Sequence, residues 1–292
     1  MKKWIKWLSA FASLLLLAEL TARLVIGLGN PLLFEYSSEY DYQLLPNQST
    51  TRLFKTISTN SLGLRGQEPK KDTRTIAKLG DSVVHGGERL SNNELSSSLL
   101  NEKLDGRGSV INISCGSWGP ENQRKFLLSH PELQFDVILY YISSHDLQDT
   151  IESFSPVGIS VDYPSIKPLF GLYETLESFV IKDMLFPSDT LVHQEDGLGR
   201  TALPDLLSYL KKRSNRVHVF VHPTIAELQA GTLGWRGNRI VQMLEEEGLS
   251  FQSNLGSMKP EFYRDDIHLN EKGHEFLAEQ AYQLLLDRDW LD

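Results

Sequence analysis

The chain has 292 residues, of which 40% are hydrophobic and 23% are charged, so most of it is expected to fold as ordinary globular protein. A net charge of -9, with no long basic run after residue 30, excludes the basic footprint of a nucleic-acid-binding protein. The single cysteine, Cys115, excludes a disulfide framework within the chain and a cysteine-based metal site.

Residues 1–28 have the pattern of a membrane segment. Three lysines within the first six residues precede an uncharged apolar run that starts at Trp7. Residues 4–28 are long enough for an α-helix that crosses a bilayer. Glu19 and Arg23, four apart near the outer end of this run, are expected to pair on one face of the helix.

Two interpretations of this segment remain open. A cleaved signal peptide fits the basic start, but no convincing cleavage site with small residues follows the apolar run. An uncleaved signal anchor fits the length better and is favoured. Both export the chain from about residue 30 onward, because the lysines stay on the cytoplasmic side. We therefore expect a single-pass membrane protein with a cytoplasmic N-terminus and the rest of the chain extracytoplasmic.

Three regions are expected along the chain. After the membrane segment, residues 29–72 have many turn-forming residues and no sustained periodicity, which predicts a connector. Residues 73–292 alternate apolar strand patterns with helical ones, which predicts one α/β domain. Residues 151–200 fit this alternation poorly and are expected to form an insertion near one end of the sheet.

The domain is predicted to hold five strands and five principal helices. The strands are expected at 75–79, 109–113, 137–142 and 217–221, with a weaker one at 249–252. The helices are expected at 93–104, 121–128, around 206–210, at 239–247 and at 271–286. Strands separated by helices favour a mainly parallel sheet, and ligands of such sheets gather at the carboxyl ends of the strands. The residues that follow each strand are therefore the candidates for function.

The first two strands each end in a loop suited to ester chemistry. Gly80 allows a sharp turn, and Ser82 then opens the next element as a candidate nucleophile whose own N–H is an oxyanion donor. Gly116 follows the second strand and offers a second N–H to the same space. Each loop taken alone is also explained as an ordinary turn.

Two further blocks carry acid–base residues. The third strand ends in residues 143–146, which include His145 and Asp146. Near the C-terminus, Asp265 and His268 are three apart, so the carboxylate can bind the imidazole Nδ1 and leave Nε2 to take a proton from a serine. A helix N-cap region at Asn270 with an exposed histidine is the structural alternative. No G-x-S-x-G elbow is present, which argues against the ordinary α/β-hydrolase arrangement.

Together the blocks at residues 80–82, 116, 143–146 and 265–268 resemble the SGNH (GDSL-type) hydrolase superfamily, in the branch with an N-terminal membrane segment. Residues 60–66 resemble that branch too, and the likeness covers about residues 56–286. It implies a three-layer α/β/α sandwich with a mainly parallel, flavodoxin-like sheet. It also implies esterase, lipase-like or acyl-transfer chemistry that uses no metal or other cofactor.

The resemblance implies Ser82 as nucleophile, His268 as base and Asp265 as its partner, with Asp266 as the fallback acid. One position departs from the family, which usually has an asparagine as third oxyanion donor where this chain has His145. A histidine can donate from a ring nitrogen, but it is bulkier. The change therefore predicts a slow enzyme, an altered specificity or a loss of catalysis.

Three functions are therefore carried forward. The leading one is an extracytoplasmic serine esterase that removes an acyl or acetyl group from a small ester or a carbohydrate. An O-acetyltransferase in the assembly of an envelope or secreted glycan would use the same residues. A non-catalytic glycan-binding or scaffold protein on the same fold is the third, and His145 is its main support. The expected partners are an acyl ester, which in the leading case includes acylated glycans, and the membrane, but not nucleic acid.

The remaining histidines are weaker candidates. His218 and His222 are expected to share a strand face, where packing is favoured over a metal pair because no third ligand is evident. His85 is expected in the first turn of a helix, and His274 on a helix surface. Arg65 is expected to brace the turn at residues 60–66 rather than to bind an acidic substrate.

Overall fold

The computed structural model describes residues 2–70, 73–149, 151, 155–176 and 201–291. A five-stranded, entirely parallel sheet forms the centre of the fold, in the order β6-β5-β7-β8-β9. Its strands are β5 (Thr75–Gly80), β6 (Ser109–Ser114), β7 (Val137–Ser143), β8 (Val217–His222) and β9 (Ser250–Ser253). This is the flavodoxin-like order 2-1-3-4-5, whose ligand crevice lies where the strand order reverses, at β5 and β7.

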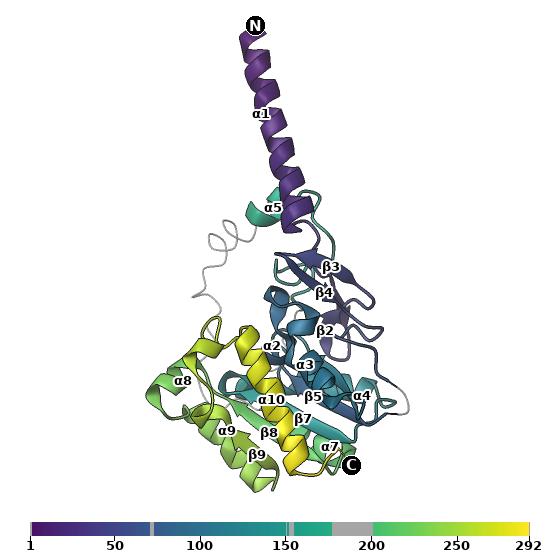
Figure 1. Ribbon diagram of the computed structural model, residues 1–292, viewed down its shortest axis with the longest axis vertical. Helices are drawn as coiled ribbons and strands as arrows, with labels where there is room; N and C mark the ends of the chain where they lie inside the picture. Colours follow the sequence, from purple (N-terminus) through teal and green to yellow (C-terminus); the bar gives the residue numbers. More distant parts are fainter. Residues whose placement is uncertain (1, 71–72, 150, 152–154, 177–200, 292) are drawn as a thin grey trace.

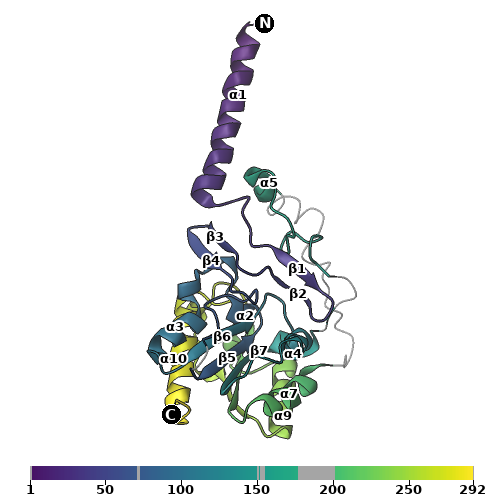
Figure 2. The same ribbon diagram turned by 90° about the vertical axis from the view of Figure 1, so that its right-hand side faces the viewer.

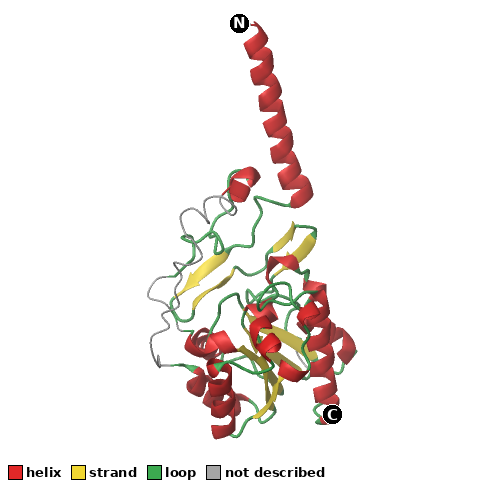
Figure 3. Ribbon diagram, turned by 90° about the vertical axis from the view of Figure 1, so that its left-hand side faces the viewer, coloured by secondary structure: helices red, strands yellow, loops and turns green. Residues whose placement is uncertain are grey.

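Helices cover both faces of the sheet, as the sequence predicts (Figures 1 and 3). One face carries α4 (Pro120–Ser129), α7 (Leu203–Arg213) and α9 (Trp235–Glu246). The other carries α3 (Ser96–Leu104) and α10 (Glu271–Asp287). The strands of such a sheet are buried on both sides, and every residue of β6, β7 and β8 is buried. The three-layer α/β/α architecture is therefore confirmed.

The predicted elements fall close to the observed ones. The Asn270 side chain accepts the Gly273 N–H and begins α10, whose apolar stripe at Leu277, Ala281 and Leu285 is fully buried. The short helix α8 (Ile225–Ala230) was not expected from periodicity, whereas α2 (Ser82–His85) is the helix in whose first turn His85 was expected. Each is only one to two turns long, so neither displays a helical repeat.

The segment expected as a connector contains two antiparallel hairpins. The first pairs β1 (Phe34–Ser37) with β2 (Asp41–Leu44), and the second pairs β3 (Ser49–Arg52) with β4 (Lys55–Ser58). Each strand has only four residues, and all four residues of β2 are buried, so the alternation that normally identifies a strand is absent. Tyr42 Oη donates to the Gly116 carbonyl at 2.8 Å, which fixes the first hairpin against the loop after β6.

The described part of the expected insertion is a strap, residues 155–176, which ends in α5 (Gly171–Leu176). The Phe34 N–H donates to the Pro164 carbonyl at 2.8 Å, and Tyr163 packs edge-to-face on Phe34 and Tyr42. The strap therefore lies along the first hairpin. The part of the predicted insertion at 177–200 falls outside the described residues.

The N-terminus forms one long helix that projects from the rest of the molecule (Figure 1). It consists of α1 (Lys2–Thr21) and a π-helical turn, η1 (Ala22–Ile26). The helix from Lys3 to Ile26 is long and apolar enough to cross a membrane, and only 6% of its most apolar 18-residue stretch is buried. Gly27 ends the helix with φ +82°, and the carbonyl of Thr51 lies where a side chain at Gly27 would be, 2.1 Å from a built Cβ. The end of the helix is thus packed directly on the second hairpin (Figure 2).

Candidate active site

The turn after β5 places Ser82 at the start of α2. Gly80 is required there because a Cβ would lie 2.4 Å from the Val84 side chain and 3.1 Å from the Tyr141 carbonyl. Asp81 is the N-cap of α2 and accepts the Val83 N–H at 2.9 Å. Because the first N–H groups of a helix have no partner within it, the Ser82 N–H is not used by the helix ladder.

His268 and Asp265 complete a relay with this serine. The His268 Nε2 lies 3.0 Å from the Ser82 Oγ, and its Nδ1 lies 2.9 and 3.0 Å from the two carboxylate oxygens of Asp265. The structure therefore brings Ser82 together with His268, which lies 186 positions later in the sequence, and with Asp265. This is the geometry of a nucleophile, a base and an orienting acid.

Asp265, rather than its neighbour Asp266, is the acid of this relay. Its Oδ1 also accepts the N–H groups of His268 at 2.8 Å and Ile267 at 3.2 Å. Burial raises the pKa of Asp265, but these hydrogen bonds and the nearby His268 outweigh it and lower the pKa below its usual value. The carboxylate is thus held ionised. Asp266 instead uses its carbonyl, which accepts the Ile225 N–H at 2.9 Å.

The loop that carries the relay is braced by the end of β8. His222 is fully buried, stacks on Tyr263, and its Nε2 donates to the Ile267 carbonyl at 3.1 Å. Burial lowers the pKa of His222 to about 4, so the ring is neutral. Tyr263 Oη donates to the Pro223 carbonyl. His222 is therefore a structural support, as predicted. His218 does not pair with His222; its ring instead hydrogen-bonds to the Ser250 Oγ at 2.9 Å.

His145 lies between two buried carboxylates. Its Nε2 is 3.1 Å from Asp146 Oδ1 and 3.4 Å from Asp81 Oδ2. Burial lowers the pKa of His145, but Asp146 and Asp81 outweigh it and raise the pKa to about 10, so the ring is a cation at neutral pH. Its Nδ1 is buried with no hydrogen-bond partner in the described part of the chain.

The pKa values of the two carboxyl groups, Asp81 and Asp146, shift in opposite directions. Burial raises the pKa of Asp81, but the contact with His145 and the Val83 N–H lower it below the usual value. Burial and the charge of Asp81 raise the pKa of Asp146 well above the usual value. The ligand-type atoms of these residues and His145 lie within 4.8 Å of one another, a spacing that a metal ion can bridge, but the imidazolium already supplies a positive charge there.

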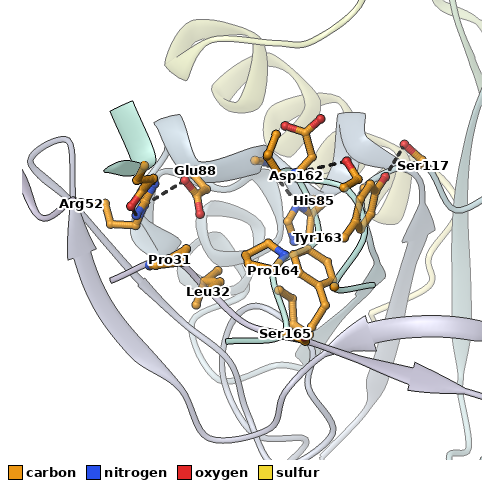
Figure 4. A pocket seen from close by; sticks show the side chains of 18 of the residues that line it. Pro31, Leu32, Arg52, His85, Glu88, Ser117, Asp162, Tyr163, Pro164 and Ser165 are labelled. Atoms are coloured by element: carbon orange, nitrogen blue, oxygen red, sulfur yellow. Dashed lines mark hydrogen bonds and ion pairs between the residues drawn. The ribbon is translucent and has the colours of Figure 1, made fainter. Parts of the chain in front are cut away.

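A cavity of about 680 Å³ opens beside the relay (Figure 4). Ser82, His268 and Gly116 line it on the side of the sheet, as does Arg264, whose guanidinium faces Asp265 at 3.4 Å. Apart from its chain neighbours, no described residue lies within 4 Å of where a Cβ on Gly116 would be, so this glycine borders open space.

The opposite side of the cavity comes from outside the parallel sheet. It is lined by Pro31 and Leu32 before the first hairpin, by Arg52 of β3, and by strap residues that include Tyr163. Tyr163 Oη donates to Ser117 Oγ at 2.9 Å and so joins the strap to the loop after β6. Arg52 pairs with Glu88 at 2.9 Å and also with Glu174 of α5. These residues are not predicted from the sequence, because their pairs join segments far apart in the chain.

Among the weaker candidates, Arg65 and His85 lie as predicted and His274 does not. Arg65 is buried and donates to the carbonyls of His85, Gly87 and Leu90, so its role is structural. His85 is the last residue of α2 and also lines the cavity, and burial lowers its pKa to about 3. The prediction that His274 is exposed is wrong. It is fully buried, and its Nδ1 accepts the Ser96 N–H at 3.1 Å because that face of α10 packs on α3.

No family model matches the sequence, and none of the curated proteins compared with it matches either. Solved structures of similar shape include a lipase/acylhydrolase from Enterococcus faecalis, with 16% identity, a TM-score of 0.45, and coverage of 74% of this chain and 97% of the other. A carbohydrate acetylesterase family member from Sinorhizobium meliloti has 14% identity, a TM-score of 0.41, and coverage of 75% and 99%.

A psychrotrophic esterase from Pseudoalteromonas sp. has 15% identity, a TM-score of 0.44, and coverage of 75% of this chain and 98% of the other. At these identities and TM-scores the likeness is one of overall shape, and the function of this chain depends on its own side chains.

Proposed function

We propose that this chain is a serine-dependent ester hydrolase of the SGNH type, with Ser82 as nucleophile. The observation that carries the proposal is the relay from Ser82 Oγ through His268 to Asp265, at 3.0 and 2.9 Å, beside an open cavity. A scaffold protein that had lost catalysis would favour a broken relay or a cavity filled by protein. Neither is observed among the described residues.

The reaction follows from this geometry. Ser82 Oγ attacks the ester carbonyl while His268 Nε2 takes its proton, and Asp265 stabilises the imidazolium that forms. His268 then returns the proton to the leaving alcohol, and a water molecule, activated by the same Nε2, hydrolyses the acyl-serine. In a transferase a sugar hydroxyl would replace this water, and analysis of the products distinguishes the two reactions.

The developing oxyanion is stabilised by the N–H groups of Ser82 and Gly116. His145 acts in this proposal as a fixed cation next to Asp81, rather than as a direct third donor, because its Nε2 faces two carboxylates. Its charge offsets that of the Asp81 carboxylate, which directly precedes the nucleophile. This arrangement differs from the neutral amide that the family motif usually has at this position.

The N-terminal helix is proposed to be an uncleaved anchor, with the lysines cytoplasmic and the catalytic domain on the other side of the membrane. Its outer end is integrated into the fold, which supports the anchor over a cleaved signal. The Glu19 carboxylate accepts the N–H groups of Gly171 at 2.7 Å and Leu172 at 3.0 Å, and so caps α5. Arg23 pairs with Glu19 and donates to the Leu169 carbonyl.

Labelling of the full-length protein by a fluorophosphonate probe in detergent tests the proposal. We expect stoichiometric labelling of the wild type and none of Ser82→Ala. Ser117→Ala is the matched control, because Ser117 lines the same cavity but lies outside the relay. An intact, folded wild type that does not react, or a Ser82→Ala variant that still reacts, would show that the nucleophile is assigned wrongly.

A further inference from the structure

The turn between β3 and β4 exposes two large apolar side chains. Arg52 pairs with Lys55, so the loop consists of Leu53 and Phe54 alone. Both have positive φ, +50° and +63°, the pattern of a type I′ turn, which strongly favours Asn-Gly. A side chain in this left-handed region costs free energy, and Phe54 is 77% exposed, so packing within the fold does not compensate for it.

This turn lies at the foot of the N-terminal helix. The Leu53 N–H donates to the Ile26 carbonyl, the last residue of η1, at 2.7 Å. The close approach of Thr51 to Gly27 holds the same hairpin against the helix end. Figures 1 and 2 show β3 and β4 directly beside this end of the helix.

A second exposed apolar pair lies at the same foot. Leu169 and Phe170, which directly precede α5, are 81% and 57% exposed. Arg23 donates to the Leu169 carbonyl, and Glu19 caps the N–H groups that follow Phe170, so the pair is fixed beside the helix. We call Leu53, Phe54, Leu169 and Phe170 the foot patch.

The foot patch lies beside the end of the span, which exposes apolar side chains of its own. Leu24 and Val25, in the last turn of the helix, are 80% and 57% exposed. Residues Lys3–Ile26 are suited to a bilayer, so the same bilayer ends beside the foot patch. Apolar side chains next to a span lower their free energy by entering the interfacial layer. A bilayer is therefore the occupant that fits this surface.

The cavity opens beside the foot patch. Ile166 and Tyr173 of the strap both line the cavity and are 77% and 47% exposed, so the cavity has an apolar rim. Pro168 also lines the cavity, and its carbonyl accepts from Arg23 at 3.4 Å. The lining thus extends from Ser82 to a residue in contact with the span.

We propose that the foot patch rests in the interfacial layer of the membrane that holds the helix, and that Ser82 acts on an acyl ester of a membrane-resident amphiphile. The inference rests on the proposed function and adds its substrate class. The amphiphile enters past Ile166 and Tyr173. The ester C–O bond breaks as the acyl–Oγ bond forms, the alcohol leaves with the proton from His268, and water then releases the fatty or other acyl acid.

Lipid quenching tests the surface without using catalysis. Cys115 is the only cysteine of the sequence and is buried. Burial raises the pKa of its thiol to about 12, against the lowering effect of the Gly116 and Leu44 N–H groups. Because the buried thiol is unreactive, cysteines added at the surface are labelled selectively. Phe54→Cys and Phe170→Cys would carry an environment-sensitive fluorophore in full-length protein reconstituted into phosphatidylcholine vesicles. Leu286→Cys is the control, because Leu286 is 41% exposed in the last turn of α10, and α10 lies away from the foot of the N-terminal helix (Figure 1).

We expect nitroxide-bearing lipids in these vesicles to quench the labels at 54 and 170 but not the label at 286. No quenching at 54 and 170, in protein whose helix is incorporated, would overturn the inference. Self-quenching between labelled chains in detergent would identify a second copy of the chain as the occupant instead.

Replacement of the turn tests the link to the substrate. Leu53→Asn combined with Phe54→Gly supplies the sequence that a type I′ turn prefers, so the variant should unfold at a temperature equal to or above that of the wild type. Its reaction with a fluorophosphonate in detergent should be unchanged. Turnover of a fluorogenic acyl glycerophospholipid in vesicles should fall about tenfold, the order expected from loss of one buried aromatic anchor.

The same acyl group on a soluble, monomeric ester is the comparison substrate. The wild type should prefer the vesicle substrate at least about tenfold, a difference worth 1.4 kcal/mol, and the turn variant should lose this preference. Equal turnover of both substrates by the wild type, or no effect of the turn variant, would sink the substrate assignment. A wild type that fails to react with the fluorophosphonate at all contradicts the proposed function instead, so the two failures are distinguishable.

Discussion

The cavity has two walls, and the chain builds them in different ways. The sheet wall, which holds Ser82, Gly116 and His268, consists of loops at the carboxyl ends of parallel strands. The strap wall comes from the segment before the first hairpin, from both hairpins and from the strap at 155–176; outside the strap its lining residues are Pro31, Leu32, Phe34, Leu44 and Arg52. The sheet wall holds the residues of the proposed relay, and the strap wall borders the N-terminal helix. We infer that one wall determines the rate of bond breaking and the other determines which ester reaches it.

The largest predicted effect tests the sheet wall. Asp265→Asn keeps the size of the side chain but removes the charge that holds the His268 tautomer, so kcat should fall by about 10⁴. Ester hydrolysis and fluorophosphonate reaction rates would measure it. Asp266→Asn is the matched control, since Asp266 contributes its carbonyl to the fold, and it should keep nearly full activity. Similar losses in both variants would contradict the assignment of Asp265.

The next prediction tests the strap wall. Glu174→Gln removes the charge that pairs with Arg52, whose side chain is 7% exposed, and leaves one oxygen in place of the two that accept from Arg52 and the Gly29 N–H. The free energy of unfolding should fall by about 3 kcal/mol, the lower end for a broken buried pair, because Glu88 still binds Arg52. KM should rise while the reaction of Ser82 with a small fluorophosphonate stays within about twofold, since the relay is untouched.

Glu88→Gln is the control for this pair. Glu88 binds the same Arg52, but the Glu88 side chain is 37% exposed and belongs to the sheet wall. The fall in the free energy of unfolding should therefore stay below about 1 kcal/mol. Urea unfolding in detergent would measure both variants. If Glu174→Gln lowered kcat as Asp265→Asn does, the separation of roles between the two walls would be wrong.

A smaller effect, on the stability of the fold, is expected from Lys78 in the strand that precedes Ser82. Lys78 is fully buried in β5, its ammonium lies 4.3 Å from the Tyr141 ring centroid, and it has no hydrogen-bond partner among the described residues. Burial lowers its pKa well below the usual value. Lys78→Met should therefore stabilise the fold by about 1–3 kcal/mol at pH 7. Lys103→Met, at an exposed pair with Glu279, should change little.

The stabilisation expected from Lys78→Met should depend on pH in a defined direction. Between the lowered folded pKa of Lys78 and its unfolded value of about 10.4, the unfolded chain binds more protons. Wild-type stability should consequently rise with pH through this window, and the advantage of Lys78→Met should shrink towards pH 10. A gain that stays constant with pH would mean that Lys78 is charged in the fold.

The last prediction concerns the pH dependence that His145 gives to the stability of the fold. Its folded pKa of about 10 lies above the unfolded value of about 6.5, so its contribution to stability is complete below pH 6.5 and is lost as pH rises towards 10. The difference in unfolding midpoint between the wild type and His145→Asn should shrink over this window. His222, with a folded pKa of about 4, should give the opposite slope, since its contribution is lost as pH falls below 6.5.

The sheet wall could be predicted from the sequence because its signals are local. Ser82 follows an apolar strand across a Gly-Asp pair, and the spacing of Asp265 and His268 allows their hydrogen bond within one turn. The parallel sheet itself followed from apolar runs separated by helical patterns. What the sequence left open was the direction of the His145 ring, because the carboxylates that hold it come from two different loops.

The strap wall could not be predicted, for three physical reasons. Its strands are four residues long, which is too short for a clear period. Its second hairpin turns at Leu53 and Phe54, which carry no turn signal. Its main ion pair joins Arg52 to Glu174, 122 positions later, and a single sequence shows no such pairing. Equally, the burial of His274 depends on α3, a helix distant in sequence.

The short passage from the helix end to the cavity has a kinetic consequence. Because Ile26 ends the helix and Pro31 already lines the cavity, extended chain between them spans at most about 18 Å. With the helix in a bilayer, Ser82 samples a thin shell above the lipid surface and cannot search bulk solution. Its encounters with lipid esters occur by lateral diffusion, so turnover would scale with the mole fraction of substrate in the bilayer and would be insensitive to dilution of the vesicles.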